Sequence, residues 1–217
     1  MKHAAWTIAL MIGLAAPAAA QWPGEPLWSN PKAGTGLTIS GDYAHPDSTY
    51  GKGNTWGGRV SLGLGTMTFT AGVSTWKPEG PTQSFTSVGG TAAFRLIGGS
   101  LIPVAVGLEL GAAHTDSANA TPAATRLTGG AGMSIPLPTP GFTIEPYFAP
   151  GLRYTSNLPT ALGGGNSTEF GYAVGANVSF GVWGIHLAYD SEKQKVGGSR
   201  GVFGVGAHVG IHLPLGM

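Results

Sequence analysis

Apolar and polar residues alternate along most of this chain. In the stretch from Phe170 to Gly181, FGYAVGANVSFG, every second residue is Phe, Tyr, Val or Ala, and the residues between them are Gly, Ala, Asn and Ser. A period of two is typical of an extended strand with two different faces. One face of this strand is therefore predicted to be apolar, and the other to carry small, partly polar side chains.

Ten segments show this alternation and predict ten strands. Their connections alternate between short ones, such as Gly65–Thr66, and longer ones, such as Ser156–Ser167. Short–long alternation is typical of an up-and-down barrel in an outer membrane. We therefore predict an all-β fold, a transmembrane antiparallel β-barrel of ten strands, or of eight if two weaker segments are not strands. The ten segments are 36–45, 55–64, 67–76, 84–96, 101–114, 124–137, 142–155, 168–180, 183–190 and 201–215.

The beginning of the chain predicts export. Lys2 precedes an apolar run from Ala4 to Ala16, and small residues end at Ala20 before Gln21. This is the pattern of a secretory signal peptide, so residues 1–20 are predicted to be cleaved. Residues 21–35 are rich in proline and glycine and are predicted to be an irregular segment, followed by the barrel at 36–217. Beyond residue 20 no apolar run is long enough for a membrane-spanning helix.

The composition supports this class. Charged residues make up 10% of the chain, against the usual quarter or so, and 38 of 217 residues are glycine. The formal net charge is +1, so nothing indicates attraction to nucleic acid. The chain has no cysteine, which excludes disulfide and thiol chemistry.

Periodicity alone does not distinguish a membrane barrel from a soluble β-sandwich. The position of the charges along the strands does. All charges inside the predicted strands fall on the polar face, and none of them is lysine. Arginine and carboxylate side chains suit an enclosed lumen in which they pair, and glycines on the same face leave them room. An ion on the lipid face would cost about 2–4 kcal/mol at the midplane. The predicted lumen-lining charges are Asp42, Arg59, Arg95, Glu109, Arg126, Glu145, Arg153, Glu169 and Asp190.

Aromatic residues on the apolar face fall near both ends of the predicted strands. Two aromatic belts around a band of Val, Leu and Ile are expected where a barrel crosses the membrane interfaces. The belt near the longer loops is predicted to contain Tyr43, Trp56, Tyr154, Tyr172 and Tyr189. The belt near the short turns is predicted to contain Phe69, Phe94, Phe142, Phe180 and Trp183.

The signal peptide, the alternating strands and the short–long connections together resemble the small Gram-negative outer-membrane β-barrel proteins of porin-like or opacity type. The resemblance covers the chain after residue 20. It implies a location in the bacterial outer membrane, with outer-membrane lipid and the barrel assembly machinery as partners. Members usually end on an aromatic residue, whereas this chain keeps the alternation through Val209, Ile211, Leu213 and Leu215 but ends at Met217.

Three histidines on the polar face, His186, His208 and His212, are predicted to be lumen groups that form hydrogen bonds. His208 and His212 are about 13 Å apart on one strand, too far to share a metal ion with bonds of about 2 Å. We therefore predict no metal site and no cofactor. No grouping of nucleophile, base and orienting residue is evident, so no enzymatic activity is predicted.

Four prolines fall inside predicted strands: Pro103, Pro136, Pro146 and Pro150. Each removes a ladder hydrogen bond. Pro103 and Pro136 lie near strand ends, whereas Pro146 and Pro150 are expected to mark a bulge or a bend in the seventh strand.

The predicted function is an integral outer-membrane barrel that is structural or forms a narrow porin-like passage for small solutes or ions. A small barrel is largely filled by side chains, although the many inward glycines leave space for a thin aqueous path. The alternatives are a barrel-embedded lipid-modifying enzyme, a surface adhesin and a soluble lipocalin-like binding protein.

Overall fold

The computed structural model describes residues 21–80, 83–99, 102–118 and 121–211, and nearly all of them lie in antiparallel strands. The predicted signal peptide, His212 and the residues from Leu213 to Met217 lie outside the described residues. No helix among the described residues is long and apolar enough to cross a membrane. The strands are β1 (Thr35–Pro46), β2 (Asn54–Leu64), β3 (Met67–Lys77), β4 (Phe85–Gly99), β5 (Ile102–Thr115), β6 (Ala124–Ser134), β7 (Leu137–Thr139), β8 (Phe142–Leu158), β9 (Gly165–Phe180), β10 (Trp183–Lys193) and β11 (Ser199–Ile211).

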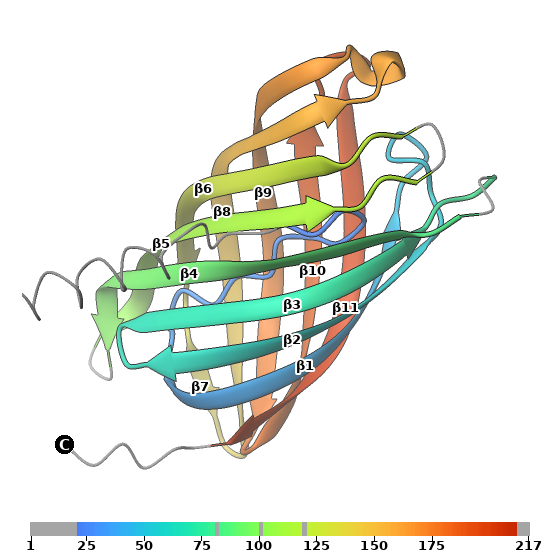
Figure 1. Cartoon of the computed structure of the whole chain (residues 1–217). Helices are drawn as coiled ribbons and strands as arrows, with labels where there is room; N and C mark the ends of the chain where they lie inside the picture. Colours follow the sequence, from blue (N-terminus) through green and yellow to red (C-terminus); the bar gives the residue numbers. More distant parts are fainter. Residues whose placement is uncertain (1–20, 81–82, 100–101, 119–120, 212–217) are drawn as a thin grey trace, which may run out of the picture.

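The strands close into a barrel (Figure 1). Apart from β7, each strand pairs with the strands before and after it, and β1 pairs with β11 from Leu37↔Ile211 to Pro46↔Val202. The short strand β7 pairs with β8 alone, while β6 also pairs with β8, so ten strands form the wall. The prediction of ten strands is confirmed and that of eight is wrong. Closure pairs the backbone groups of every strand, as hydrocarbon surroundings demand.

One predicted strand is divided in two. The segment 124–137 was expected to be continuous, but β6 ends at Ser134 and Leu137 begins β7. Pro136 lies between them, and a proline N cannot donate to a ladder. The alternation of apolar residues continues through the break, which is why the pattern does not reveal it.

Pro146 and Pro150 lie at positions of β8 that form no ladder pair with β6. Pairing of β8 with β9 runs through both prolines without a shift. Pairing with β6 stops at Gly130↔Gly151 and resumes at Met133↔Phe148, so Pro150 falls in the gap. Pro146 lies just past the last β6 pair and accepts a hydrogen bond from Ile135 N at 3.1 Å through its carbonyl. Pro103 lies where the β4–β5 register shifts.

The barrel is apolar outside and polar inside. Leu187 is 43% exposed and Leu110 is 62% exposed, whereas Arg153 and Asp190 are each 1% exposed. A soluble protein would reverse this arrangement. The exterior therefore has the chemistry of a lipid-facing surface.

The turns agree with the predicted alternation of lengths. Gly65–Thr66 and Gly181–Val182 are two-residue turns, and Gly65 and Gly181 have φ of 81° and 67°, which favour glycine. The longer connections are 47–53, 78–84, 116–123, 159–164 and 194–198. The barrel thus has a short-turn end and a long-loop end.

The predicted belt aromatics lie on the outward face, and several stack on one another. Tyr43 and Trp56 have ring centroids 4.7 Å apart near the long-loop end. Phe142, Phe180 and Trp183 form a stack at the short-turn end, with centroid distances of 5.7 and 4.8 Å. Trp56, Phe69, Phe94, Tyr172, Trp183 and Tyr189 are exposed, and Tyr43, Phe142, Tyr154 and Phe180 are partly exposed.

Candidate functional site

Residues 21–34 lie inside the barrel, and we call them the N-terminal plug. They form no helix or strand, and the chain runs from Gln21 down the lumen to Gly34, where β1 begins (Figure 1, blue). Gln21 and Glu25 are 1% exposed and Trp22 is 2% exposed. An irregular segment was expected here, but its position in the lumen was not.

The first residue of the plug is held at the long-loop end by buried charges. Gln21 donates to Asp190 Oδ1 at 2.8 Å and accepts from Arg126 Nη2 at 2.6 Å. Arg153 donates to both carboxylate oxygens of Asp190, and Glu192 accepts from Arg126. Each buried arginine pairs with a carboxylate, so no charge of this network is left buried without an opposite charge, which would be costly. This network fills the long-loop half of the lumen.

The middle of the plug packs against a second network. Arg59 donates to both oxygens of Asp42, at 2.6 and 2.9 Å, and its guanidinium lies 5.1 Å from the ring centre of Trp28. His186 meets the same indole edge-on at 4.6 Å. Trp28 Nε1 donates to Glu25 Oε2 at 3.2 Å, which ties two plug residues together.

Glu25 is a carboxyl group with unusual surroundings. Its Oε1 has no hydrogen-bond partner among the described residues. Burial, reinforced by the nearby negative charge of Asp42, raises the pKa of Glu25 to about 7, although Arg59 and Trp28 oppose the shift. The plug therefore carries a group that titrates near neutral pH.

Asp42, His186 and His208 form a hydrogen-bonded chain across β1, β10 and β11. His186 Nε2 lies 2.6 Å from Asp42 Oδ1, and the two Nδ1 atoms of His186 and His208 are 3.3 Å apart. His186 Nε2 thus faces both an acceptor, Asp42 Oδ1, and a donor, Arg59 Nη2, which lies 3.1 Å away. Across the described ranges, no group of three or more His, Asp or Glu side chains is arranged to hold a metal ion.

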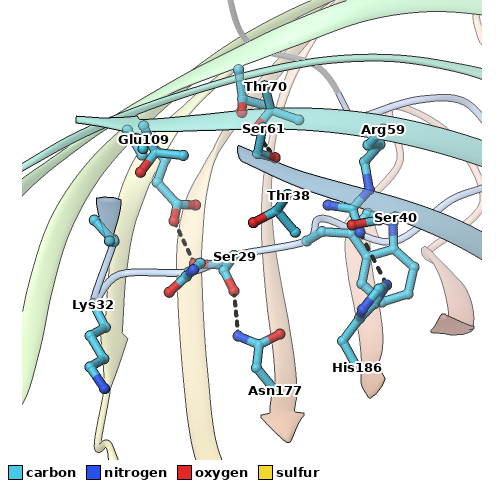
Figure 2. Close-up of a pocket in the computed structure, with 18 of the residues that line it drawn as sticks. Ser29, Lys32, Thr38, Ser40, Arg59, Ser61, Thr70, Glu109, Asn177 and His186 are labelled. Carbon is cyan, nitrogen blue, oxygen red and sulfur yellow. Dashed lines mark hydrogen bonds between the residues drawn. The ribbon is translucent and has the colours of Figure 1, made fainter. Parts of the chain in front are cut away.

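The last part of the plug is held at the short-turn end by two carboxylates and an amide. Ser29 Oγ donates to Glu109 Oε1 at 2.5 Å, and Asn177 Nδ2 donates to the Ser29 carbonyl at 3.1 Å (Figure 2). Lys32 N donates to Glu145 Oε1 at 3.2 Å, and Arg95 donates to the Lys32 carbonyl at 2.7 Å. Plug and wall are therefore joined through side chains from four different strands.

A cavity of about 590 Å³ lies beside this part of the plug. Its lining includes Ser29, Lys32 and the turn residue Val182, so it reaches the short-turn end. Figure 2 shows Thr38, Ser61 and Thr70 on one side and Asn177 on the other. The lumen is thus filled in its long-loop half and hollow in its short-turn half.

Inward glycines make room for the large polar side chains. A Cβ on Gly171 would lie 2.6 Å from Arg153 Cζ, and a Cβ on Gly132 would lie 2.8 Å from Ser29 Oγ. A Cβ on Gly57 would collide with Glu25 Oε1. The small face of the stretch 170–181 therefore leaves space for arginine, as the sequence suggested.

The structure places all nine of the predicted lumen charges on the inward face, and they divide by depth. Arg126, Arg153 and Asp190 join the long-loop network, and Asp42 and Arg59 join the central one. Glu109, Glu145 and Arg95 contact the last part of the plug, and Glu169 accepts from Ser167.

Sequence reasoning missed several residues of the site. Glu192 and Arg200 were assigned to a loop, although Glu192 continues the inward alternation of His186 and Asp190. Extending that period by two residues would have found it. The plug residues have no alternation to follow, and only the unusual density of tryptophan and proline in QWPGEPLWSNP hinted at packing.

Comparisons with known proteins give likeness in fold alone. No family model matches the chain, and no curated protein matches its sequence. The β-domain of the Bordetella autotransporter BrkA matches with a TM-score of 0.50 and 11% identity, covering 82% of this chain and 100% of that one. The N-terminal β-barrel domain of Pseudomonas aeruginosa OprF matches with a TM-score of 0.39, 10% identity and coverage of 82% and 99%. Neisserial surface protein A matches with a TM-score of 0.35, 17% identity and coverage of 82% and 98%. The likeness to the autotransporter β-domain is one of fold, a closed antiparallel β-barrel.

Proposed function

We propose that this protein is an integral barrel of the bacterial outer membrane that forms a narrow, porin-like passage closed by its N-terminal plug. The observation that carries the proposal is the position of residues 21–34, which occupy the lumen between the long-loop network and the cavity. A barrel filled by a separate chain segment differs from one filled by its own wall side chains, because a segment can leave without breaking the wall.

The contacts of the plug support a removable closure. Among the described residues the plug forms no ladder with any strand, and its polar contacts with the wall are separate hydrogen bonds, most of them to side chains. Each such bond contributes about 0.5–1.5 kcal/mol net, more where a charge is involved. The plug is therefore held by separate side-chain contacts, whereas the wall is held by continuous ladders.

The other candidate functions have less support. In the part of the chain described, no serine hydroxyl is hydrogen-bonded to a histidine, so the pairing that a barrel-embedded hydrolase needs is not assembled. The connections 47–53 and 194–198 are short, which leaves little surface for adhesion. We therefore propose a passage without enzymatic activity.

Removal of the plug tests the passage directly. In a planar bilayer the wild-type protein is expected to conduct little, and a variant lacking residues 21–33 is expected to conduct clearly more. Folding of the variant is checked by heat-modifiable gel mobility. A folded variant that conducts no more than the wild type overturns the proposal.

A disulfide offers a second test, because the chain has no native cysteine. A Cβ at Gly132 would lie 2.8 Å from Ser29 Oγ, so S29C/G132C brings two sulfurs within bonding reach. Oxidation is expected to link the two residues and to abolish the residual channel openings seen in a planar bilayer. A reductant is expected to restore these openings. The matched control S29C/G129C places the second cysteine on the outward face and should not cross-link. Absence of the S29C/G132C link contradicts the position of the plug.

A further inference from the structure

The cavity at the short-turn end has one wall of hydroxyl groups. Thr38, Ser61, Thr70 and Thr91 line it from β1, β2, β3 and β4. Ser61 and Thr70 share a hydrogen bond of 2.8 Å, and each hydroxyl keeps further capacity to donate or accept. This wall offers donors and acceptors without charge.

The rest of the lining offers acceptors. Glu109, Glu145 and Asn177 each use one polar atom to hold the plug. Their remaining oxygens, Oε2 of both glutamates and Oδ1 of Asn177, form no hydrogen bond with any other described residue. These three oxygens are available to a molecule in the cavity.

The charges around the cavity discriminate between classes of solute. Arg59 is paired with Asp42, and Arg153 with Asp190, so neither guanidinium is left to attract an anion. The remaining lysine of the lining, Lys32, is exposed and lies beside Glu145, whose carboxyl group offsets its charge. An anionic solute would otherwise meet the carboxyl groups of Glu109 and Glu145. A simple cation would satisfy those carboxyl groups but would leave the hydroxyl wall to water.

We propose that this cavity binds a neutral polyhydroxylated solute of saccharide size. Such a molecule donates hydroxyl protons to Glu109, Glu145 and Asn177 and exchanges hydrogen bonds with the Ser61–Thr70 wall. The volume of about 590 Å³ lies within the range of small-molecule sites, about 300–1,000 Å³. The inference rests on the proposed function, since it names the class of solute that the passage takes.

Calorimetric titration of the full, plugged protein tests this inference. The protein is prepared in a detergent without a sugar headgroup and titrated with glucose and with maltose, and saturable binding of at least one is expected. The variant S61A/T70V removes both partners of one hydrogen bond, so it leaves no buried group unpaired, and it should weaken binding about tenfold. The matched control T75V/T86V removes a hydroxyl pair of the exposed surface, 3.5 Å apart, and should bind as the wild type does.

A comparison of a charged with a neutral sugar is the second part of the test. Glucuronate is expected to bind more weakly than glucose, because its carboxylate faces those of Glu109 and Glu145. Absence of saturable binding of neutral sugars up to their solubility limit overturns the inference, as does tighter binding of glucuronate or equal weakening by the control. Because binding is measured with the plug in place, failure here leaves the conductance of the plug-free variant as a separate result.

Discussion

Arg153 shows at the level of one residue how the lumen tolerates charge. Its side chain is 1% exposed, donates to both oxygens of Asp190 and lies beside Gly171, where any side chain would occupy its place. We predict that R153M lowers the free energy of unfolding by about 3–5 kcal/mol, because the buried Asp190 would lose the cation that it pairs with. R95M should cost about 1 kcal/mol, since Arg95 makes one hydrogen bond to a carbonyl. Urea unfolding followed by gel mobility measures both, and equal losses would contradict the assignment.

Glu25 makes the stability of the plugged barrel depend on pH. Its pKa rises from 4.5 to about 7 through burial and the charge of Asp42, so between these values the folded state holds a proton that the unfolded state has lost. The contribution of Glu25 to stability is therefore fully present below about pH 4.5 and is lost as pH rises towards about 7, by about 3 kcal/mol in all.

E25Q tests the sign of this dependence, because glutamine stays neutral. The variant should match the wild type at about pH 4 and exceed it in stability at about pH 8. E79Q, on an exposed carboxylate paired with Lys52, is the control and should leave the profile unchanged. A wild-type stability that rises between these two pH values, with E25Q following it, would refute the role of Glu25.

At the scale of elements, β2 presents two adjacent glycines to opposite sides of the wall. Gly57 faces the plug, and a Cβ there would collide with Glu25 Oε1, while a Cβ on Gly58 would have its nearest neighbour, Ser40 O, at 3.8 Å. We predict that G57V displaces the plug and raises conductance in a planar bilayer, and that G58V does not. The two variants place the same β-branched residue on the same strand, so propensity does not separate them. Equal conductance of both would show that the plug does not depend on this contact.

The strands were predictable from sequence because a half-buried strand leaves a period of two along the chain. Their number and most of their bounds follow from that period, and the break at Pro136 does not, because alternation continues across it. The plug was not predictable in the same way. Its position depends on contacts with residues far along the chain, such as Ser29 with Glu109 and Gln21 with Asp190, and no local pattern records them. The lumen charges were therefore identified one by one, but their grouping by depth was not.

At the scale of the whole molecule, apolar side chains cover the outside of the barrel and charged side chains lie inside it, the reverse of a soluble protein. Closed ladders let the wall keep its shape while the lumen holds a segment that forms no ladder, and the apolar exterior makes hydrocarbon the preferred surroundings. Glycines then serve the interior, because a narrow barrel holds arginine or glutamate only where a neighbouring position is empty. The short-turn half of the lumen is hollow because serine and threonine, which line it, have short side chains.

Because the exterior faces lipid, the cost of an outward-facing arginine should depend on its depth in the membrane. Leu187 faces outward on β10, between Ala176 and Val205 and between the aromatic residues at the two ends of the strand. L187R should destabilise the barrel in lipid vesicles by about 2–4 kcal/mol, because it places a cation in the hydrocarbon band. S191R, on the same outward face of β10 but nearer the long-loop end, should cost about 0–1 kcal/mol, because the guanidinium reaches the interface there. Urea unfolding of the vesicle-inserted proteins measures both, and a barrel that accepts arginine equally at the two positions does not turn this face to hydrocarbon.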